Sequence, residues 1–213
     1  MENKQQVHNL IILDESGSMA SIQETTIQGF NEIVQTIKGI EKQYPDQEHF
    51  ISLISFNGLG IKTHHFMDRV EKLTELNTSR YHPDALTPLF DAMGFGINKL
   101  KQALSDQTNF NVLVTILTDG EENASKEFSG YDIKKIVEEL KMKSWTFTYI
   151  GTDHEVDQFA ISVSITNSMV FSKNDEDMKK MFAKEKSARM MYSQKIHRKE
   201  DTKDDFYDSK PND

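Results

Sequence analysis

The stretch Asn9-Leu-Ile-Ile-Leu-Asp-Glu-Ser-Gly-Ser-Met19 decides the fold of this chain. Its apolar run ends in the carboxylate of Asp14, and two serines follow at the second and fourth positions after that residue. A short apolar run without polar alternation is typical of a strand buried on both faces of a parallel sheet. The carboxyl end of this strand therefore brings Asp14, Ser16 and Ser18 to one edge of the sheet. Because hard oxygens are the ligands that Mg²⁺, Mn²⁺ and Ca²⁺ prefer, the loop is predicted to form half of a metal site.

Apolar strands and amphipathic helices alternate along the rest of the chain. The expected strands cover residues 50–56, 61–66, 111–118, 145–150 and 169–171, and the expected helices begin near residues 27, 89, 130, 153 and 175. Alternation of this kind predicts right-handed crossovers and an α/β fold whose mostly parallel sheet has helices on both faces. Asn57-Gly58 predicts a hairpin that adds an antiparallel edge strand.

The length of 213 residues suits one α/β domain with a short extension. We expect the domain to cover residues 1–194. From residue 195 to residue 213 charged residues of both signs predominate and apolar residues are few. A segment of this composition buries too little apolar surface to offset the entropy lost on ordering, so we predict a disordered tail.

The charge and the cysteine content exclude several classes of function. A formal net charge of −9 repels a phosphate backbone, so we expect no nucleic-acid partner. The absence of cysteine excludes disulfides and thiolate chemistry and agrees with a reducing compartment. The polar N-terminus and the short apolar run behind it fit neither a signal peptide nor a membrane span. We therefore expect a cytoplasmic protein that does not bind a membrane.

The second half of the predicted metal site lies far along the chain. The apolar strand 111–118 ends in Asp119-Gly120, and Thr87 precedes Pro88 at the start of a predicted helix. In open parallel sheets, ligands bind beyond the carboxyl ends of the strands where the strand order reverses. The candidate ligands are thus Asp14, Ser16, Ser18, Thr87 and Asp119, which hold Mg²⁺, with Mn²⁺ or Ca²⁺ as alternatives. Three of the five are neutral hydroxyls, so a carboxylate from outside the chain can complete the coordination.

At these residues the chain resembles the von Willebrand factor A-type (vWA) domain with an intact metal-ion-dependent adhesion site. Residues 14–18 match the pattern Asp-x-Ser-x-Ser, and Thr87 and Asp119 follow in the expected order. The resemblance covers residues 7–192 and implies a Rossmann-like fold with a six-stranded sheet. It implies that Ser16 and Ser18 bind Mg²⁺ directly and that the two aspartates often bind through water. Without cysteines or a signal segment, the chain looks like the stand-alone intracellular bacterial members of the family.

Other polar residues near the predicted site have simpler interpretations. Glu121 and Glu122 favour a solvated acidic rim over metal coordination. His64 and His65 are neighbours on a predicted strand and point to opposite faces, so they do not suit one zinc ion. The serines of the first loop could also cap a helix, an interpretation that Thr87 and Asp119 disfavour.

Three functional hypotheses follow. The first is a non-enzymatic, Mg²⁺-dependent protein-interaction module that binds an Asp or Glu of a partner. The second is a Mg²⁺-dependent hydrolase or phosphatase of α/β topology. That hypothesis is weakened because Ser16 stands where a carboxylic acid would protonate a leaving group. The third is a scaffold whose metal is purely structural.

Overall fold

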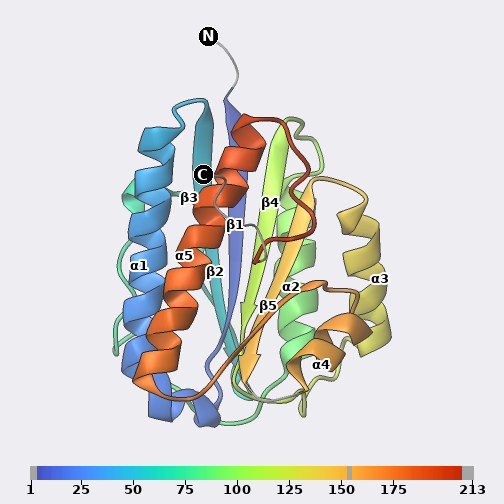
Figure 1. The fold of residues 1–213 in the computed structure, drawn as a ribbon. Coiled ribbons are helices and arrows are strands. Elements are labelled where there is room, and N and C mark those ends of the chain that lie inside the picture. The colour runs from blue at the N-terminus through green and yellow to red at the C-terminus, as the bar shows by residue number, and fades with distance from the viewer. Residues whose placement is uncertain (1–3, 153–154, 208–213) are drawn as a thin grey trace.

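A computed structural model describes residues 4–152 and 155–207, and in this part of the chain a six-stranded sheet lies between two layers of helices (Figure 1). The strand order is β3-β2-β1-β4-β5-β6, and only the β2–β3 pair is antiparallel. This architecture confirms the predicted fold class. The strands are β1 (Gln5–Asp14), β2 (Gln47–Asn57), β3 (Gly60–Arg69), β4 (Phe110–Leu117), β5 (Trp145–Thr152) and β6 (Asn167–Phe171).

The helices divide between the two faces of the sheet. They are α1 (Gln23–Gln43), α2 (Leu89–Ala103), α3 (Gly130–Lys141), α4 (Val156–Ser162) and α5 (Asp175–His197). Helices α1 and α5 cover one face side by side, and α2, α3 and α4 cover the other (Figure 1). A side chain at Gly29 of α1 would overlap the ring of Phe182 on α5, at 2.0 Å from its Cε2 atom. The absence of a side chain at Gly29 is what allows these two helices to approach.

Strand β1 shows why its sequence is apolar without alternation. Leu10 and Ile12 pack into the core beneath α2 and α3, whereas Ile11 and Leu13 pack into the core beneath α1 and α5. Successive side chains of a strand point to opposite faces, so a central strand covered on both faces needs an apolar residue at every position. Burial of both faces therefore fixes β1 at the centre of the sheet.

Local sequence signals explain several boundaries. Helix α1 ends just before Pro45, as predicted, since proline cannot continue a helix. Ser129 and Asp132 form the predicted capping box at the start of α3, with Ser129 Oγ accepting from the Asp132 amide at 3.3 Å. Helix α4 begins at Val156 rather than near residue 153, and residues 153 and 154 lie outside the described part of the chain.

The segment after residue 195 differs from the prediction of a disordered tail. Helix α5 continues to His197, and residues 198–207 return along the sheet. Phe206 is buried against Tyr192, and Asn167 of β6 accepts a hydrogen bond from the Phe206 amide at 3.0 Å. Two neighbouring aromatic residues thus give the segment the apolar surface that its average composition hides. Residues 208–213 lie outside the described part of the chain.

Within residues 4–152 and 155–207, none of the helices combines the length and the apolar character needed to cross a bilayer.

Candidate metal centre

The sheet brings the first loop and the end of β4 together. Strands β1 and β4 are parallel neighbours, and Leu13 pairs with Leu117. Asp14 and Thr118 are therefore aligned at the carboxyl edge, and Asp119 follows directly. The chain runs from β1 toward β2 on one side and returns to β4 on the other, so the order reverses between these two strands. This is the point at which open α/β sheets bind ligands.

Side-chain oxygens from three separate loops converge at this edge. We call the set the rim cluster: Asp14, Ser16, Ser18, Thr87 and Asp119. Ser18 Oγ lies 3.1 Å from Ser16 Oγ and donates a hydrogen bond of 2.6 Å to Asp119 Oδ1. The Ser16 amide donates to Asp14 Oδ1 at 2.7 Å, which closes the turn of the first loop. These contacts link Asp14, Ser16 and Ser18 of the first loop to Asp119 at the end of β4.

The position of Gly120 places Thr87 in the same cluster. A β-carbon added at Gly120 would lie 3.1 Å from Thr87 Oγ1, 3.4 Å from Ser18 Oγ and 3.7 Å from Asp14 Oδ2. Two oxygens of the first loop and one of Thr87 therefore surround one small space beside the glycine. Asn123 holds the Thr87 backbone there, since its Oδ1 accepts from the Thr87 amide at 2.9 Å. The structure thus brings all five predicted residues to one place.

Asp14 is the most buried member of the rim cluster, with 0% of its surface exposed. Burial raises the pKa of its carboxyl to about 6, and the nearby charge of Asp119 acts in the same direction. Thr118 opposes this effect by donating a hydrogen bond of 2.5 Å from Oγ1 to Asp14 Oδ2. A carboxylate in this position is stabilised further by any cation that enters the cluster.

Asp119 is also buried, and one of its two carboxylate oxygens lacks a hydrogen-bond donor within the described residues. Oδ2 accepts no hydrogen bond within the described residues. Lys173 Nζ lies 2.9 Å away, close enough for an ion pair but not aligned for a hydrogen bond. The lysine side chain is 38% exposed, so water screens its charge. The rim cluster therefore contains two buried carboxylates, and the cation beside them is a partly solvated ammonium.

The donor set fits a small hard cation. Adjacent ligands of octahedral Mg²⁺, each 2.0–2.1 Å from the ion, are about 2.9 Å apart. The separation of the two serine oxygens is 3.1 Å. Carboxylate and hydroxyl oxygens suit Mg²⁺ or Mn²⁺, and Ca²⁺ is compatible with the same chemistry. Asp119 Oδ2, which accepts no hydrogen bond within the described residues and has a partly exposed ammonium beside it, is the kind of buried oxygen that a bound cation would satisfy.

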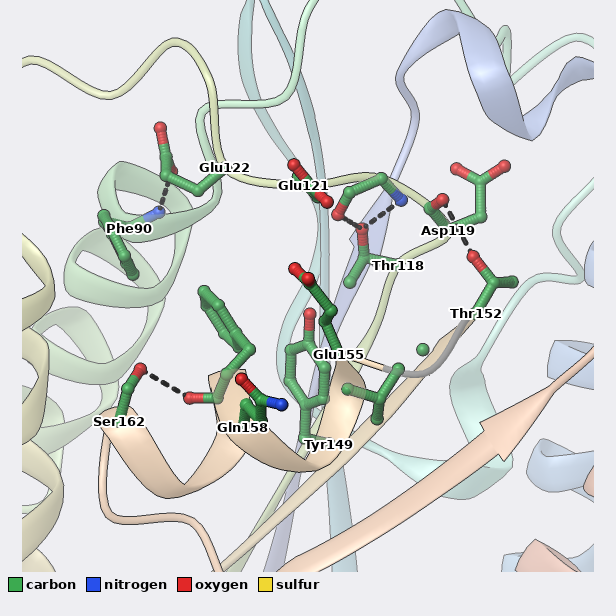
Figure 2. Close-up of a pocket in the computed structure, with 14 residues that line it drawn as sticks. Phe90, Thr118, Asp119, Glu121, Glu122, Tyr149, Thr152, Glu155, Gln158 and Ser162 are labelled. Carbon is green, nitrogen blue, oxygen red and sulfur yellow. Dashed lines mark hydrogen bonds between the residues drawn. The ribbon is translucent and has the colours of Figure 1, made fainter.

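Several residues outside the motif hold the cluster in place. Glu15 is fully buried and accepts hydrogen bonds from Ser55 Oγ at 2.5 Å and from the His82 amide at 2.6 Å. Lys62 pairs with Glu15 at 2.8 Å, and this neutralises the carboxylate. Glu122 differs from the predicted solvated rim, because its carboxylate accepts from the amide of Phe90 at 2.8 Å (Figure 2) and from the amide of Ser125 at 2.7 Å. Glu121 is exposed.

Thr118, Lys173 and the structural role of Glu122 were not predicted from the sequence. Lys173 follows the end of β6, a parallel strand, and such strands all bring their carboxyl ends to the same edge. That topological rule could have placed Lys173 near Asp119. The hydrogen bonds of Glu122 depend on the path of a loop, and no sequence pattern marks them.

The adjacent histidines have separate partners. His64 Nε2 lies 2.7 Å from Ser55 Oγ, and His65 Nδ1 lies 2.8 Å from Asp68 Oδ2. Among residues 4–152 and 155–207, no group of three or more histidine, aspartate or glutamate side chains is placed to hold a metal. The rim cluster is not a group of this kind, because three of its five side chains are hydroxyls and only two are carboxylates.

Comparison with known proteins agrees with the architecture. The family model described as the von Willebrand factor type A domain matches residues 10–195. No curated protein sequence matches the chain.

Solved structures share the fold at low sequence identity. The SpRpn10 VWA domain has a TM-score of 0.56 at 9% identity, with 84% of this chain and 94% of that one covered. The pilus adhesin SpaC from Lactobacillus rhamnosus GG, in an open conformation, has a TM-score of 0.63 at 12% identity, covering 90% and 30%. Proximal thread matrix protein 1 from the mussel byssus has a TM-score of 0.56 at 13% identity, covering 88% and 47%. The chain spans about half of the byssus protein and less than a third of the adhesin.

Proposed function

Because the chain belongs to the von Willebrand factor type A domain family, whose members generally mediate protein–protein interactions, we propose that it is a Mg²⁺-dependent interaction module. In this proposal the rim cluster is a metal-ion-dependent adhesion site. Its two aspartates, two serines and one threonine hold the ion. An aspartate or glutamate of a partner protein completes the coordination. The ion supplies a concentrated positive charge and an open position that a carboxylate can occupy.

The observation that carries the proposal is the convergence of two buried carboxylates with three hydroxyls at the sheet edge. Burying carboxylates beside one another is costly unless a cation offsets their charge. In this proposal the two aspartates bind the ion through water, so its direct protein ligands are neutral hydroxyls and an open position on it attracts a further anion. The cluster is thus suited to capture a carboxylate from outside.

Exposed apolar side chains next to the rim support a binding role. Leu86 precedes Thr87 and is 58% exposed, and Leu59 at the β2–β3 turn is 77% exposed. The two segments touch, since a side chain at Gly58 would lie 2.9 Å from the Leu86 amide nitrogen. Apolar residues that surround a polar centre provide contact area for a partner.

The hydrolase hypothesis finds less support at this site. Ser16 occupies the position where a phosphatase of similar topology needs a carboxylic acid, and a hydroxyl is a poor proton donor. Glu15 is the nearest carboxylate in the loop, but Lys62 and Ser55 occupy its oxygens. A structural-metal scaffold uses the same ligands and differs in what happens when the ion is removed.

Calorimetric titration with Mg²⁺ and partner capture test the proposal together. Wild-type protein and Asp14→Ala are titrated in parallel with Asp106→Ala, a control at an exposed carboxylate far from the rim. Partner capture from the native host then compares Mg²⁺ with EDTA for all three proteins. Circular dichroism checks that each variant is folded.

We expect Mg²⁺ binding and capture for the wild type and for Asp106→Ala, and neither for Asp14→Ala. Capture that is unchanged in EDTA would refute a metal-dependent interaction. Complete loss of folded structure in EDTA favours the scaffold. Turnover of phosphate esters that needs Mg²⁺ and disappears in Asp14→Asn favours the hydrolase.

A further inference from the structure

A pocket adjoins the rim cluster and is not used by the proposed metal chemistry. It has a volume of about 480 Å³ and lies between the carboxyl ends of β4 and β5, the start of α2, and helix α4 (Figure 2). Asp119 and Gly120 belong to its lining, so the pocket is continuous with the rim. A partner residue close to the one that reaches the metal can therefore enter it.

The described residues that line this pocket carry negative charge. They include Asp119, Glu121, Glu122 and Glu155, with no lysine, arginine or histidine among them, and Lys173 pairs with Asp119 from outside the lining. The Glu122 carboxylate already accepts hydrogen bonds from three backbone amides. Glu121 and Glu155 are exposed, and their side chains make no hydrogen bond or ion pair within the described residues. The Glu155 side chain points toward the middle of the pocket in Figure 2, and Glu121 lies at its edge.

Aromatic rings form the apolar part of the lining. Phe159 stacks on Phe90 with centroids 5.7 Å apart and contacts the Tyr149 ring at 4.9 Å. These rings come from α4, α2 and β5, so the surface that they form is held by three elements. A guanidinium group stacks well on aromatic faces while its N–H groups bind carboxylates. An ammonium lacks the planar surface for this stacking.

From this combination we propose that the pocket binds an arginine side chain from the same partner segment that supplies the acidic residue to the metal. The inference about the partner rests on the proposed function, whereas the affinity of the pocket for a guanidinium does not. Charge complementarity selects a cation, and the aromatic lining selects arginine over lysine. The partner then carries an arginine within a few residues of an aspartate or glutamate.

The pocket is tested first without any carboxylate in the probe. The protein in EDTA is titrated with N-acetyl-arginine methylamide, and with the norleucine analogue as the uncharged control, while backbone amide signals are followed by NMR. We expect the arginine compound to shift the signals of Gly120, Glu121, Glu155 and Phe159, and the norleucine compound to leave them in place. Replacing both Glu121 and Glu155 with glutamine should weaken arginine binding about tenfold, because each exposed carboxylate contributes a modest part of the affinity for a cation. Glu71→Gln, an exposed residue outside the pocket, should have no effect.

Peptides with one glutamate then test whether the pocket serves the metal-bound partner. An arginine is placed at each of the four positions on either side of the glutamate, and norleucine replaces it in the matched set. In Mg²⁺ we expect at least one of the arginine peptides to bind the wild-type protein about tenfold more tightly than the matched norleucine peptide. The variant with both glutamates replaced should bind the two peptides equally and keep its affinity for Mg²⁺.

Three results decide the question. An arginine amide that shifts no pocket signal overturns the proposal, and so does an arginine that adds nothing to Mg²⁺-dependent peptide binding in any register. Arginine-dependent tightening that needs both glutamates supports it. The norleucine peptides report on the proposed function separately, because that function fails if their binding is the same in Mg²⁺ and EDTA.

Discussion

Two of the clusters in which this protein buries charge differ in whether the charge is balanced. One is the rim cluster. The other, which we call the α5 cluster, lies between α5 and the sheet and consists of Asn9, Thr115, Glu185, Arg189 and Tyr207. There the Arg189 guanidinium pairs with Glu185 at 2.8 Å and donates to Asn9 Oδ1 and Thr115 Oγ1 at 2.9 and 2.7 Å. Tyr207 donates to the other oxygen of Glu185 at 2.8 Å.

The contrast indicates what each cluster does. The α5 cluster has one charge of each sign and a protein partner for each, so it needs nothing from outside and holds the helix against the sheet. The rim cluster has two buried carboxylates and a half-solvated lysine beside one of them. Charge that is balanced internally is structural, whereas charge that is left unbalanced at a sheet edge is suited to a ligand.

The largest expected effect comes from unbalancing the α5 cluster. Arg189→Met leaves the carboxylate of Glu185 buried without a cation, and we expect a loss of about 3–5 kcal/mol in the free energy of unfolding. Urea denaturation in EDTA measures it. Arg189→Met combined with Glu185→Gln removes both charges and should recover most of the loss. If the single variant is as stable as the double variant, the charge of Arg189 does not keep Glu185 ionised. The α5 cluster would then not be an example of internally balanced charge.

The next effect is a pH dependence of stability to which two buried histidines and Asp14 contribute with opposite signs. Burial lowers the pKa of His8 to about 4, and burial together with the charge of Arg189 lowers the pKa of His49 to about 3. The unfolded chain takes up these protons near pH 6.5, so stability is lost as pH falls below that value. Asp14, whose folded pKa is raised, opposes this in the metal-free protein because it binds a proton more readily when folded.

The sum of these contributions is a loss of about 2 kcal/mol between pH 7 and pH 5, since each unit of pKa shift corresponds to about 1.4 kcal/mol. Urea denaturation in EDTA across this range checks the sign and the size. Replacing His8 and His49 with glutamine should flatten the profile or reverse its slope. A profile that the double variant does not change means that the buried histidines are not responsible.

A smaller effect is the stabilisation of the folded protein by Mg²⁺, which we expect at the rim cluster and not at the α5 cluster. At ten times its dissociation constant, Mg²⁺ should stabilise the wild-type protein by about 1.4 kcal/mol. For a chain of this size that raises the melting temperature by about 4 °C. Asp119→Asn should abolish this increase without lowering the melting temperature in EDTA, since it relieves repulsion with Asp14. A large destabilisation of Asp119→Asn in EDTA shows instead that the metal-free rim is already satisfied, as the α5 cluster is.

The rim cluster and the α5 cluster also differ in how much of each could be predicted from the sequence. Asp14, Ser16 and Ser18 lie in one short motif, and the parallel register of β1 and β4 brings Asp119 beside them, so local pattern and sheet topology sufficed. Arg189 and Glu185 have the spacing of an ordinary solvated pair on a helix surface. Their burial depends on the return of residues 198–207 across the sheet, which places Tyr207 over the pair. Composition averages over that segment, so the two aromatic residues that order it were missed.

The smallest expected effect concerns Lys173, whose ammonium partly balances the charge of the rim cluster. Its ammonium lies 2.9 Å from Asp119 Oδ2 and competes with a metal ion for the same oxygen. Removing it in Lys173→Ala should tighten Mg²⁺ binding about twofold to fivefold, because an exposed ion pair contributes up to about 1 kcal/mol. Calorimetric titration measures the change, and Lys179→Ala, an exposed lysine one turn into α5, is the matched control. Weaker Mg²⁺ binding in Lys173→Ala than in the control would mean that the lysine orients Asp119 for the ion instead of competing with it, and that the rim carries part of its own balance.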